Sequence, residues 1–192
     1  QEHTTRTGDQ ININEYPVQE NKNVRKIGQQ ILKGEIALPA GTVLTPGSIG
    51  FLIGMNVGEI EVYRKPKVGI LITGDELIGP GAELGYGQVY ESNSSMLCAA
   101  LKNEGVSDIE LCYAADNLSA TVEALERLSQ NNDLILASGG ISVGEYDFVG
   151  TALDEIGAKT VFYKVRQKPG KPLLFAKREE NFYFGLPGNP AS

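Results

Sequence analysis

A regular alternation of apolar runs and amphipathic helical runs begins at Lys65, and it constrains the fold more than any other feature of the sequence. The runs, in order, are KVGILITG, SSMLCAALKNEG, DIELCYAA, LSATVEALERLSQ and DLILASGG. Strands rich in Ile, Leu and Val that alternate with helices indicate parallel strands joined by right-handed crossovers. A further helix is predicted over 147–156, followed by strands in TVFYKVR, LLFAK and NFYFGL, with a tight turn at REEN. We therefore predict an α/β domain with a mostly parallel sheet over residues 66–192.

The first 65 residues are predicted to form a small, mixed, β-rich segment. Short strands are expected in QININEYPV and NVRKIG, and then a short extended element, a tight turn at Pro39–Ala40–Gly41 and a further strand in EIEVYRK. A helix is expected over 45–55, because Thr45 can cap it and Pro46 suits its first turn. QEHTTRTG begins inside a β module and GLPGNPAS stops where a helix could start, so we expect a piece of a longer polypeptide.

Composition and charge exclude several classes of protein. The formal charge of -7 argues against a general nucleic-acid binder, which needs a broad basic surface. Cys98 and Cys112 lie in apolar segments without metal-ligand or disulfide spacing, so we expect buried thiols. The only histidine, His3, lies in a polar terminal stretch, which leaves no candidate for a Ser/His/Asp or Cys/His nucleophile and no support for zinc. No signal peptide or membrane-length apolar run is seen, so we expect a cytoplasmic protein.

Chemistry-bearing residues follow four of the predicted strands. Parallel strands gather ligands at their carboxyl ends. The segments found there are GDEL with Gly74 and Glu76, then Asp116, then SGGISVGEYD, and last GLPGNP. The glycines after the third strand can bring backbone amides close to a phosphate or oxyanion. Taken singly, each segment is equally consistent with a turn, a solvated carboxylate, or a helix cap at Asp116 or Asp147.

The segment KPGKP, Lys168 to Pro172, places two lysines on a loop stiffened by two prolines. Lys164 precedes it by alternation from the strand TVFYKVR. Alone, these lysines are equally well read as solvated turn and strand residues. Together with the acidic groups and the glycine turn, they favour a phosphorylated substrate held through Mg²⁺, with lysines for the anion and carboxylates for the metal.

The motifs LPAGTVLTP, TGDEL, GQVYESNS, SGGISVGEYDFV, KPGKPLLFA and GLPGNPAS, in this order, resemble the MoeA family of molybdopterin molybdenumtransferases, which includes the gephyrin E domain. Molybdopterin adenylyltransferases share the fold, but KPGKP and GLPGNP are similar to the transferases. The resemblance implies a three-layer molybdopterin-binding domain, and Mg²⁺-dependent insertion of molybdate into adenylylated molybdopterin with release of AMP. It also implies a homodimer, and an upstream molybdopterin adenylyltransferase as a possible partner.

The same resemblance implies roles for individual residues. The implied catalytic residues are Glu76, Asp116, Asp147, Lys164 and Lys168, of which Asp116 and Asp147 are also the implied metal ligands. The implied substrate-binding residues are Ser138, Gly139, Gly140, Ser142, Lys171, Pro172, Pro187 and Pro190.

Family members are longer than this sequence, and their flanking segments contribute further groups to the cleft. We therefore expect the 192 residues alone to bind molybdopterin species weakly and not to turn over. Two other interpretations stay open: a non-catalytic molybdopterin-binding or scaffolding module of the same fold, and a nucleotidyltransferase that acts upstream.

Overall fold

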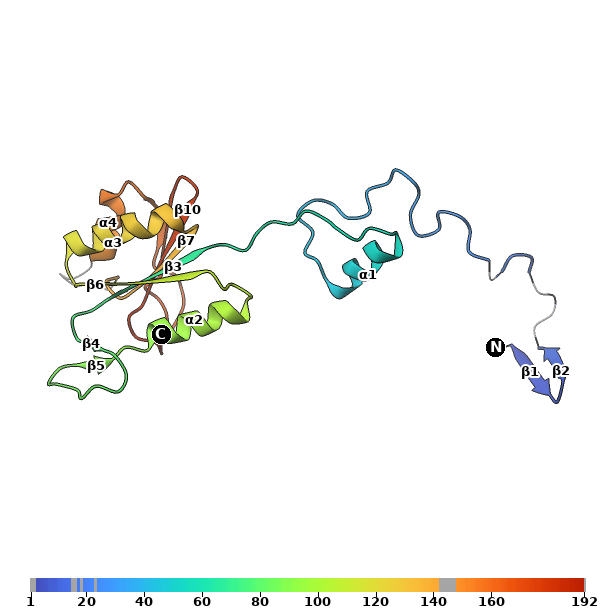
Figure 1. Ribbon diagram of the computed structural model, residues 1–192, viewed down its shortest axis with the longest axis horizontal. Helices are drawn as coiled ribbons and strands as arrows, with labels where there is room; N and C mark the ends of the chain where they lie inside the picture. The colour runs from blue at the N-terminus through green and yellow to red at the C-terminus, as the bar shows by residue number, and fades with distance from the viewer. Residues whose placement is uncertain (1–2, 15–16, 18, 23, 142–147, 192) are drawn as a thin grey trace. The chain divides into compact units, whose positions relative to one another are not determined.

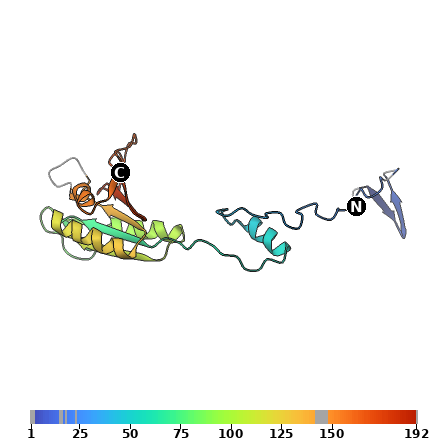
Figure 2. The ribbon, with the colours of Figure 1, turned by 90° about the horizontal axis from the view of Figure 1, so that it is seen from above.

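The computed structural model describes residues 3–14, 17, 19–22, 24–141 and 148–191. The chain divides into two compact units, Gln1–Val62 and Tyr63–Ser192 (Figures 1 and 2). No helix in the described ranges is long and apolar enough to cross a membrane.

The first unit contains one hairpin and one helix. Strands β1 (Thr4–Thr7) and β2 (Gln10–Ile13) pair antiparallel, which confirms the strand expected in QININ. Helix α1 (Pro46–Gly54) begins as predicted, with a capping box between Thr45 and Ser48. The predicted turn is also present, because the Thr42 amide donates to the Pro39 carbonyl at 3.2 Å.

Two predicted strands of this first stretch were wrong. Residues 24–28 of NVRKIG and residues 59–65 of EIEVYRK form no strand. Their apolar side chains are exposed, Ile27 fully and Val62 by 66%. An alternating pattern becomes a strand only where a neighbouring strand supplies hydrogen bonds and a packing surface, and the structure gives these segments neither.

The second unit is built on a six-stranded sheet of order β6-β3-β7-β10-β9-β8. Its strands are β3 (Val68–Thr73), β6 (Ile109–Ala114), β7 (Leu134–Ser138), β8 (Lys159–Tyr163), β9 (Leu174–Arg178) and β10 (Asn181–Leu186). The first four strands in the order are parallel, and only β9 runs against its neighbours. The mostly parallel sheet and the turn at REEN between β9 and β10 are therefore confirmed. A separate short parallel pair, β4 (Leu77–Ile78) and β5 (Val89–Tyr90), precedes helix α2.

Helices cover the sheet on both faces and make three layers (Figure 1). Helix α2 (Asn93–Asn103) lies on one face, and α3 (Leu118–Asn131) and α4 (Phe148–Glu155) lie on the other. Alternate residues of β3 divide between the two cores. Val68, Ile70 and Ile72 pack in the cluster that contains Leu97 and Leu101 of α2, whereas Leu71 packs with Leu125 and Leu128 of α3. A strand buried on both faces explains the unbroken apolar run VGILIT.

Both cysteines are free thiols in this unit. Cys112 is buried as expected, and Cys98 is only half-buried. The predicted helix over 147–156 corresponds to α4, which begins at Phe148. Its expected cap, Asp147, lies outside the described residues, as does the substrate-binding candidate Ser142.

Candidate functional site

Five strands of the sheet end at one edge, and the residues that follow them form a charge series across it. In sheet order the series begins with Asp116 after β6 and Gly74–Glu76 after β3. It continues with Gly139 and Gly140 after β7 and with Pro187 after β10. It ends with the lysine loop 164–173 after β8. Acidic loops, glycine turns and a basic loop therefore succeed one another along this edge, which brings together the predicted site residues that are described.

The acidic end is interlocked. The Asp116 amide donates to Asp75 Oδ1 at 3.1 Å, which ties the loop after β6 to the loop after β3. Burial raises the pKa of the Asp116 carboxyl, and the negative charges of Asp75 and Glu76 raise it further. Glu76 is itself exposed. Asp116 does not cap α3, because Asn117 does so by accepting the Ala120 amide at 3.0 Å.

The described residues do not form a metal cage of their own. Within the described ranges, no three His, Cys, Asp or Glu side chains are grouped so that they could hold a metal ion. The second predicted metal ligand, Asp147, lies outside those ranges. A cation bound beside Asp116 would therefore take part of its coordination from water or substrate oxygens.

The turn after β7 is closely packed against the end of β3. Gly139 has φ +98°, and a Cβ at this position would lie 2.7 Å from the Thr73 carbonyl oxygen. A side chain is therefore excluded there by conformation and by space. Ser138, the last residue of β7, is buried, and Gly140 also has a positive φ of +62°. Gly139 and Gly140 are half-buried, so part of this backbone is exposed at the edge of the sheet.

Sequence reasoning missed Asn93, the first residue of α2, which joins two of these turns. Its Nδ2 donates to Ser138 Oγ at 2.8 Å and to the Gly188 carbonyl at 2.7 Å. Asn at the start of a helix is ordinarily interpreted as a cap that bonds the backbone of its own helix. Its sequence position therefore does not suggest bonds to distant turns. The motif GQVYESNS, which carries part of the family resemblance, was the one signal that included it.

The basic end is an exposed loop held by its backbone. Strand β8 ends at Tyr163, so Lys164 is not the strand residue that alternation predicted. It has φ +69°, its amide donates to the Leu173 carbonyl at 2.9 Å, and its Nζ lies 4.8 Å from the Tyr163 ring centroid. Lys168 and Lys171 are exposed, and none of the three lysines forms an ion pair with a described acid.

The three predicted prolines lie at the same edge. Pro172, beside Lys171, and Pro187, which directly follows β10, are half-buried, whereas Pro190 is exposed in the last described turn. They limit the backbone freedom of the loops after β8 and β10, which follow the glycine turn along the edge.

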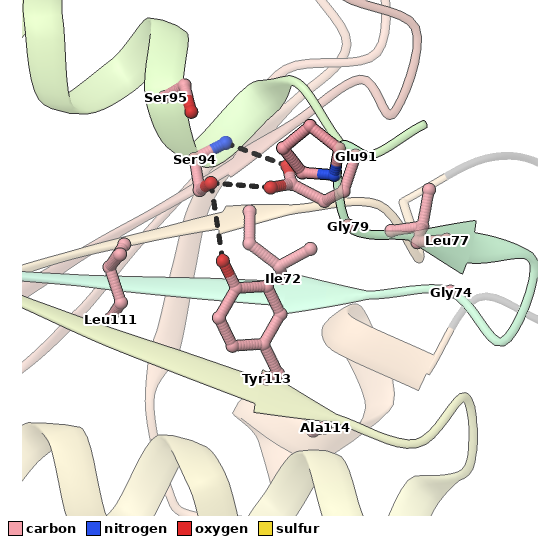
Figure 3. A pocket seen from close by; sticks show the side chains of 11 residues that line it. Ile72, Gly74, Leu77, Gly79, Glu91, Ser94, Ser95, Leu111, Tyr113 and Ala114 are labelled. Atoms are coloured by element: carbon pink, nitrogen blue, oxygen red, sulfur yellow. Dashed lines mark hydrogen bonds between the residues drawn. The ribbon is translucent and has the colours of Figure 1, made fainter. Parts of the chain in front are cut away.

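A pocket of about 450 Å³ opens beside the acidic end, and the sequence did not predict it (Figure 3). Its apolar wall includes Ile72, Leu77 and Leu111. On its polar side, Glu91 accepts hydrogen bonds from the amide and the hydroxyl of Ser94, and the Tyr113 hydroxyl donates to Ser94 Oγ at 3.3 Å. Such a mixed wall suits a ring with hydrogen-bonding groups at its rim. Three separate stretches of the chain, 72–80, 91–95 and 111–114, contribute to it, so no local motif could predict it.

The three layers and the mostly parallel six-stranded sheet define the class of protein, a three-layer α/β domain. Residues 69–192 match the family described as "Probable molybdopterin binding domain", and residues 1–55 match "MoeA N-terminal region (domain I and II)". The chain belongs to the MoeA family of molybdopterin molybdenumtransferases.

Individual relatives agree with this assignment. The chain is 39% identical over 182 residues to the molybdopterin molybdenumtransferase of Haemophilus influenzae, covering 95% of this chain and 45% of that protein. It is 33% identical over 174 residues to the Bacillus subtilis enzyme of the same name, covering 91% of this chain and 40% of that one. The crystal structure of the molybdopterin biosynthesis MoeA protein from Pyrococcus horikoshii matches all of this chain and 45% of its own, with a TM-score of 0.67 and 31% identity. The chain thus spans less than half the length of these relatives.

Proposed function

We propose that this chain is the substrate-binding core of a molybdopterin molybdenumtransferase in molybdenum cofactor biosynthesis. Its substrates are adenylylated molybdopterin and molybdate, and its products are the molybdenum cofactor and AMP. We further propose that it acts in the cytoplasm as a homodimer, and that a molybdopterin adenylyltransferase supplies its substrate.

The observation that carries the proposal is the charge series along the edge of the sheet. Neighbouring strands lie about 4.8 Å apart, so the edge from the end of β3 to the end of β8 extends about 20 Å. A substrate with one metal-binding end and one anionic end can therefore lie along it, with the glycine turns at its middle. The relatives named as molybdopterin molybdenumtransferases support the choice of substrate.

The basic and central residues would bind the anionic groups. Lys171 with Pro172, and Ser142, are proposed to contact molybdate, while Lys164 and Lys168 neutralise the phosphate. Ser138, Gly139 and Gly140 would line the position of the phosphate. The Gly139 amide already donates to the Leu186 carbonyl, so the Gly140 amide is the donor that we propose for a phosphate oxygen. Pro187 and Pro190 would hold the neighbouring loop in place. Substitution of the exposed lysines is expected to weaken binding far more than folding.

The acidic residues fit an Mg²⁺ ion that protein and substrate share. The raised pKa of Asp116 shows that its negative charge is unfavourable in this loop, and a bound cation would relieve that. Mg²⁺ is commonly held by one or two carboxylates together with water and substrate phosphates, so a complete protein cage is not needed. Asp116 and Glu76, with Asp147, would hold the ion, which when bound polarises the phosphate of the adenylate.

The test is isothermal titration with adenylylated molybdopterin, paired with an AMP-release assay that contains molybdate and Mg²⁺. We expect binding without turnover, because the aligned residues make up only 45% of the Haemophilus influenzae relative and other family segments are expected to complete the cleft. A double variant, Lys164→Ala with Lys171→Ala, should lose binding. The charge-matched control is Lys102→Ala with Lys159→Ala, two exposed lysines away from the lysine loop. Equal affinity of the double variant and the control would refute the proposed site. Turnover by this chain would refute its expected inactivity.

A further inference from the structure

We propose that Asn93 is a positioning residue that holds the turn after β7 and the turn after β10 at the spacing that the anion site requires. This inference rests on the proposed function, since it assigns a task to a side chain that supports that site. Asn93 is not a catalytic residue here, because it acts through the two turns.

The bonds of Asn93 connect three elements that are remote in the sequence. The side chain is nine-tenths buried at the start of α2, and its two hydrogen-bond acceptors belong to residues 45 and 95 positions away. Ser138 ends β7, and Gly188 lies two residues after β10. The Gly188 carbonyl can only accept, which fixes the orientation of the carboxamide. One side chain from the α2 layer thus bridges the ends of two neighbouring parallel strands.

The two turns that it bridges are in contact. The Gly139 amide donates to the Leu186 carbonyl at 3.3 Å. A Cβ at Gly188 would lie 3.5 Å from Gly139 Cα, and one at Gly139 would lie 2.7 Å from the Thr73 carbonyl. No side chain separates the turns, so their spacing depends on backbone bonds and on Asn93.

Two buried polar atoms near these turns have no hydrogen-bond partner among the described residues, Thr73 Oγ1 and Asn93 Oδ1. Buried polar atoms without a partner are rare in folded proteins, and they mark either a bound water or a functional site. An apolar side chain of similar size at position 93 would remove the unpartnered Oδ1, but it would leave the Gly188 carbonyl without its donor. The carboxamide therefore contributes through the two bonds that it donates. It does not cap its own helix either, since Glu91 accepts the Ser94 amide at 2.8 Å.

The test compares Asn93→Ala and Asn93→Asp with Asn103→Asp, an exposed position at the other end of α2. We expect Asn93→Ala to weaken AMP affinity about tenfold by isothermal titration, because the Gly188 carbonyl loses its donor. The amide resonances of Gly139 and Gly188 should shift together in ¹H–¹⁵N spectra recorded without ligand. Asn103→Asp should change neither.

The Asn93→Asp variant adds a measurement, the pH dependence of AMP affinity, that a side chain which only fills space would not change. An ionised carboxyl cannot donate to Gly188, whereas a protonated one can. Relative to the parent and to Asn103→Asp at each pH, AMP affinity should therefore recover as the pH is lowered and the introduced carboxyl becomes protonated. If Asn93→Ala does not fold, Ser138→Ala tests the same link, because it removes one acceptor and leaves α2 intact.

The outcomes separate this inference from the proposed function. Unchanged Gly139 and Gly188 resonances in Asn93→Ala, or unchanged AMP affinity in a folded variant, would overturn the role of Asn93. Failure of the parent chain to bind AMP would count against the proposed function, and the spectra would still decide whether Asn93 sets the spacing of the turns.

Discussion

The carboxylates at the two ends of the mostly parallel sheet differ in their partners and in the direction of their pKa shifts. At the amino end, Asp133 accepts two bonds of 2.6 Å from the Arg64 guanidinium and one of 2.8 Å from the Lys67 amide. The Arg64 hydrogen bonds, followed by the Lys67 amide, lower the pKa of Asp133 to about 2. At the carboxyl end, Asp116 is partly buried beside two more carboxylates, and its pKa is raised.

This difference separates a carboxylate that supports the fold from one that is available for chemistry. Asp133 is fully paired, and its hydrogen bonds hold the segment before β3 against the turn before β7. Asp116 has a backbone bond through its amide, but its carboxylate meets like charges and no basic partner in the described chain. Clustered titratable groups with shifted pKa values at strand ends are typical of functional sites. The comparison therefore predicts that replacing the Asp116 carboxylate mainly affects binding, and that breaking the Arg64–Asp133 pair mainly affects stability.

The largest expected effect is that of Gly139→Ala, which would distort the turn after β7 in the middle of the carboxyl-end edge. A side chain at φ +98° that also meets the Thr73 backbone should destabilise the fold by about 3 kcal/mol and abolish AMP binding. Gly87→Ala is the matched control, with φ +81° and nothing within 4 Å of its Cβ, and should lose only about 1 kcal/mol. Urea unfolding and AMP titration measure both effects. Equal losses in the two variants would contradict a tight turn at Gly139.

Next comes Lys171→Ala at the basic end. We expect it to raise the molybdate concentration needed for binding by about tenfold, since a charged hydrogen bond to an anion is lost, while the melting temperature stays nearly unchanged. The lysine is exposed and packs against little. Molybdate titration checks this, with Lys102→Ala as the control for the loss of one positive charge. An unchanged molybdate dependence would remove Lys171 from the anion site.

Most of this edge could be predicted from the sequence, because it follows from the strand order. The runs VGILIT and LILAS are apolar on both faces, which identifies them as central parallel strands, and the residues after them then share one edge. The loops at Asp116 and Gly139 were found in this way, whereas KPGKP was found from its lysines and prolines.

The rest depends on contacts that no local pattern encodes. Asn93 bonds residues 45 and 95 positions away, and its place at a helix start suggested a different role. Lys164 leaves the strand with a left-handed backbone because its amide pairs with Leu173, which alternation cannot reveal. NVRKIG and EIEVYRK had the pattern of strands but met no partner strand. Asp147 and Ser142 lie outside the described residues, so their roles stay predictions.

A smaller effect is expected for Asp116→Asn. The amide keeps the shape and the Asn117 cap keeps α3, so folding should be preserved, but a ligand charge for Mg²⁺ is lost. We expect the Mg²⁺ concentration that enhances AMP binding to rise about fivefold. Asp108→Asn, an exposed acid at the amino end, is the charge-matched control. Mg²⁺ enhancement of the same size in both variants would show that Asp116 does not contribute to the cation site.

The smallest effect is the pH dependence of stability, and it should have opposite signs at the two ends. Because the pKa of Asp133 is lowered to about 2, the Arg64–Asp133 pair stabilises the fold above the unfolded value of 3.8, and this stabilisation is lost as the pH falls toward 2. The pair is largely solvent-exposed, so solvent screening keeps the contribution small. Arg64→Ala should lower the free energy of unfolding at neutral pH and match the parent in strong acid.

Asp116 has a raised pKa, so its ionised form is unfavourable in the fold. Asp116→Asn should therefore raise the free energy of unfolding at neutral pH, and this gain should disappear as the pH falls. Urea unfolding across the acid range measures both curves, and a loss of stability at neutral pH in both variants would show that the two carboxylates have the same role.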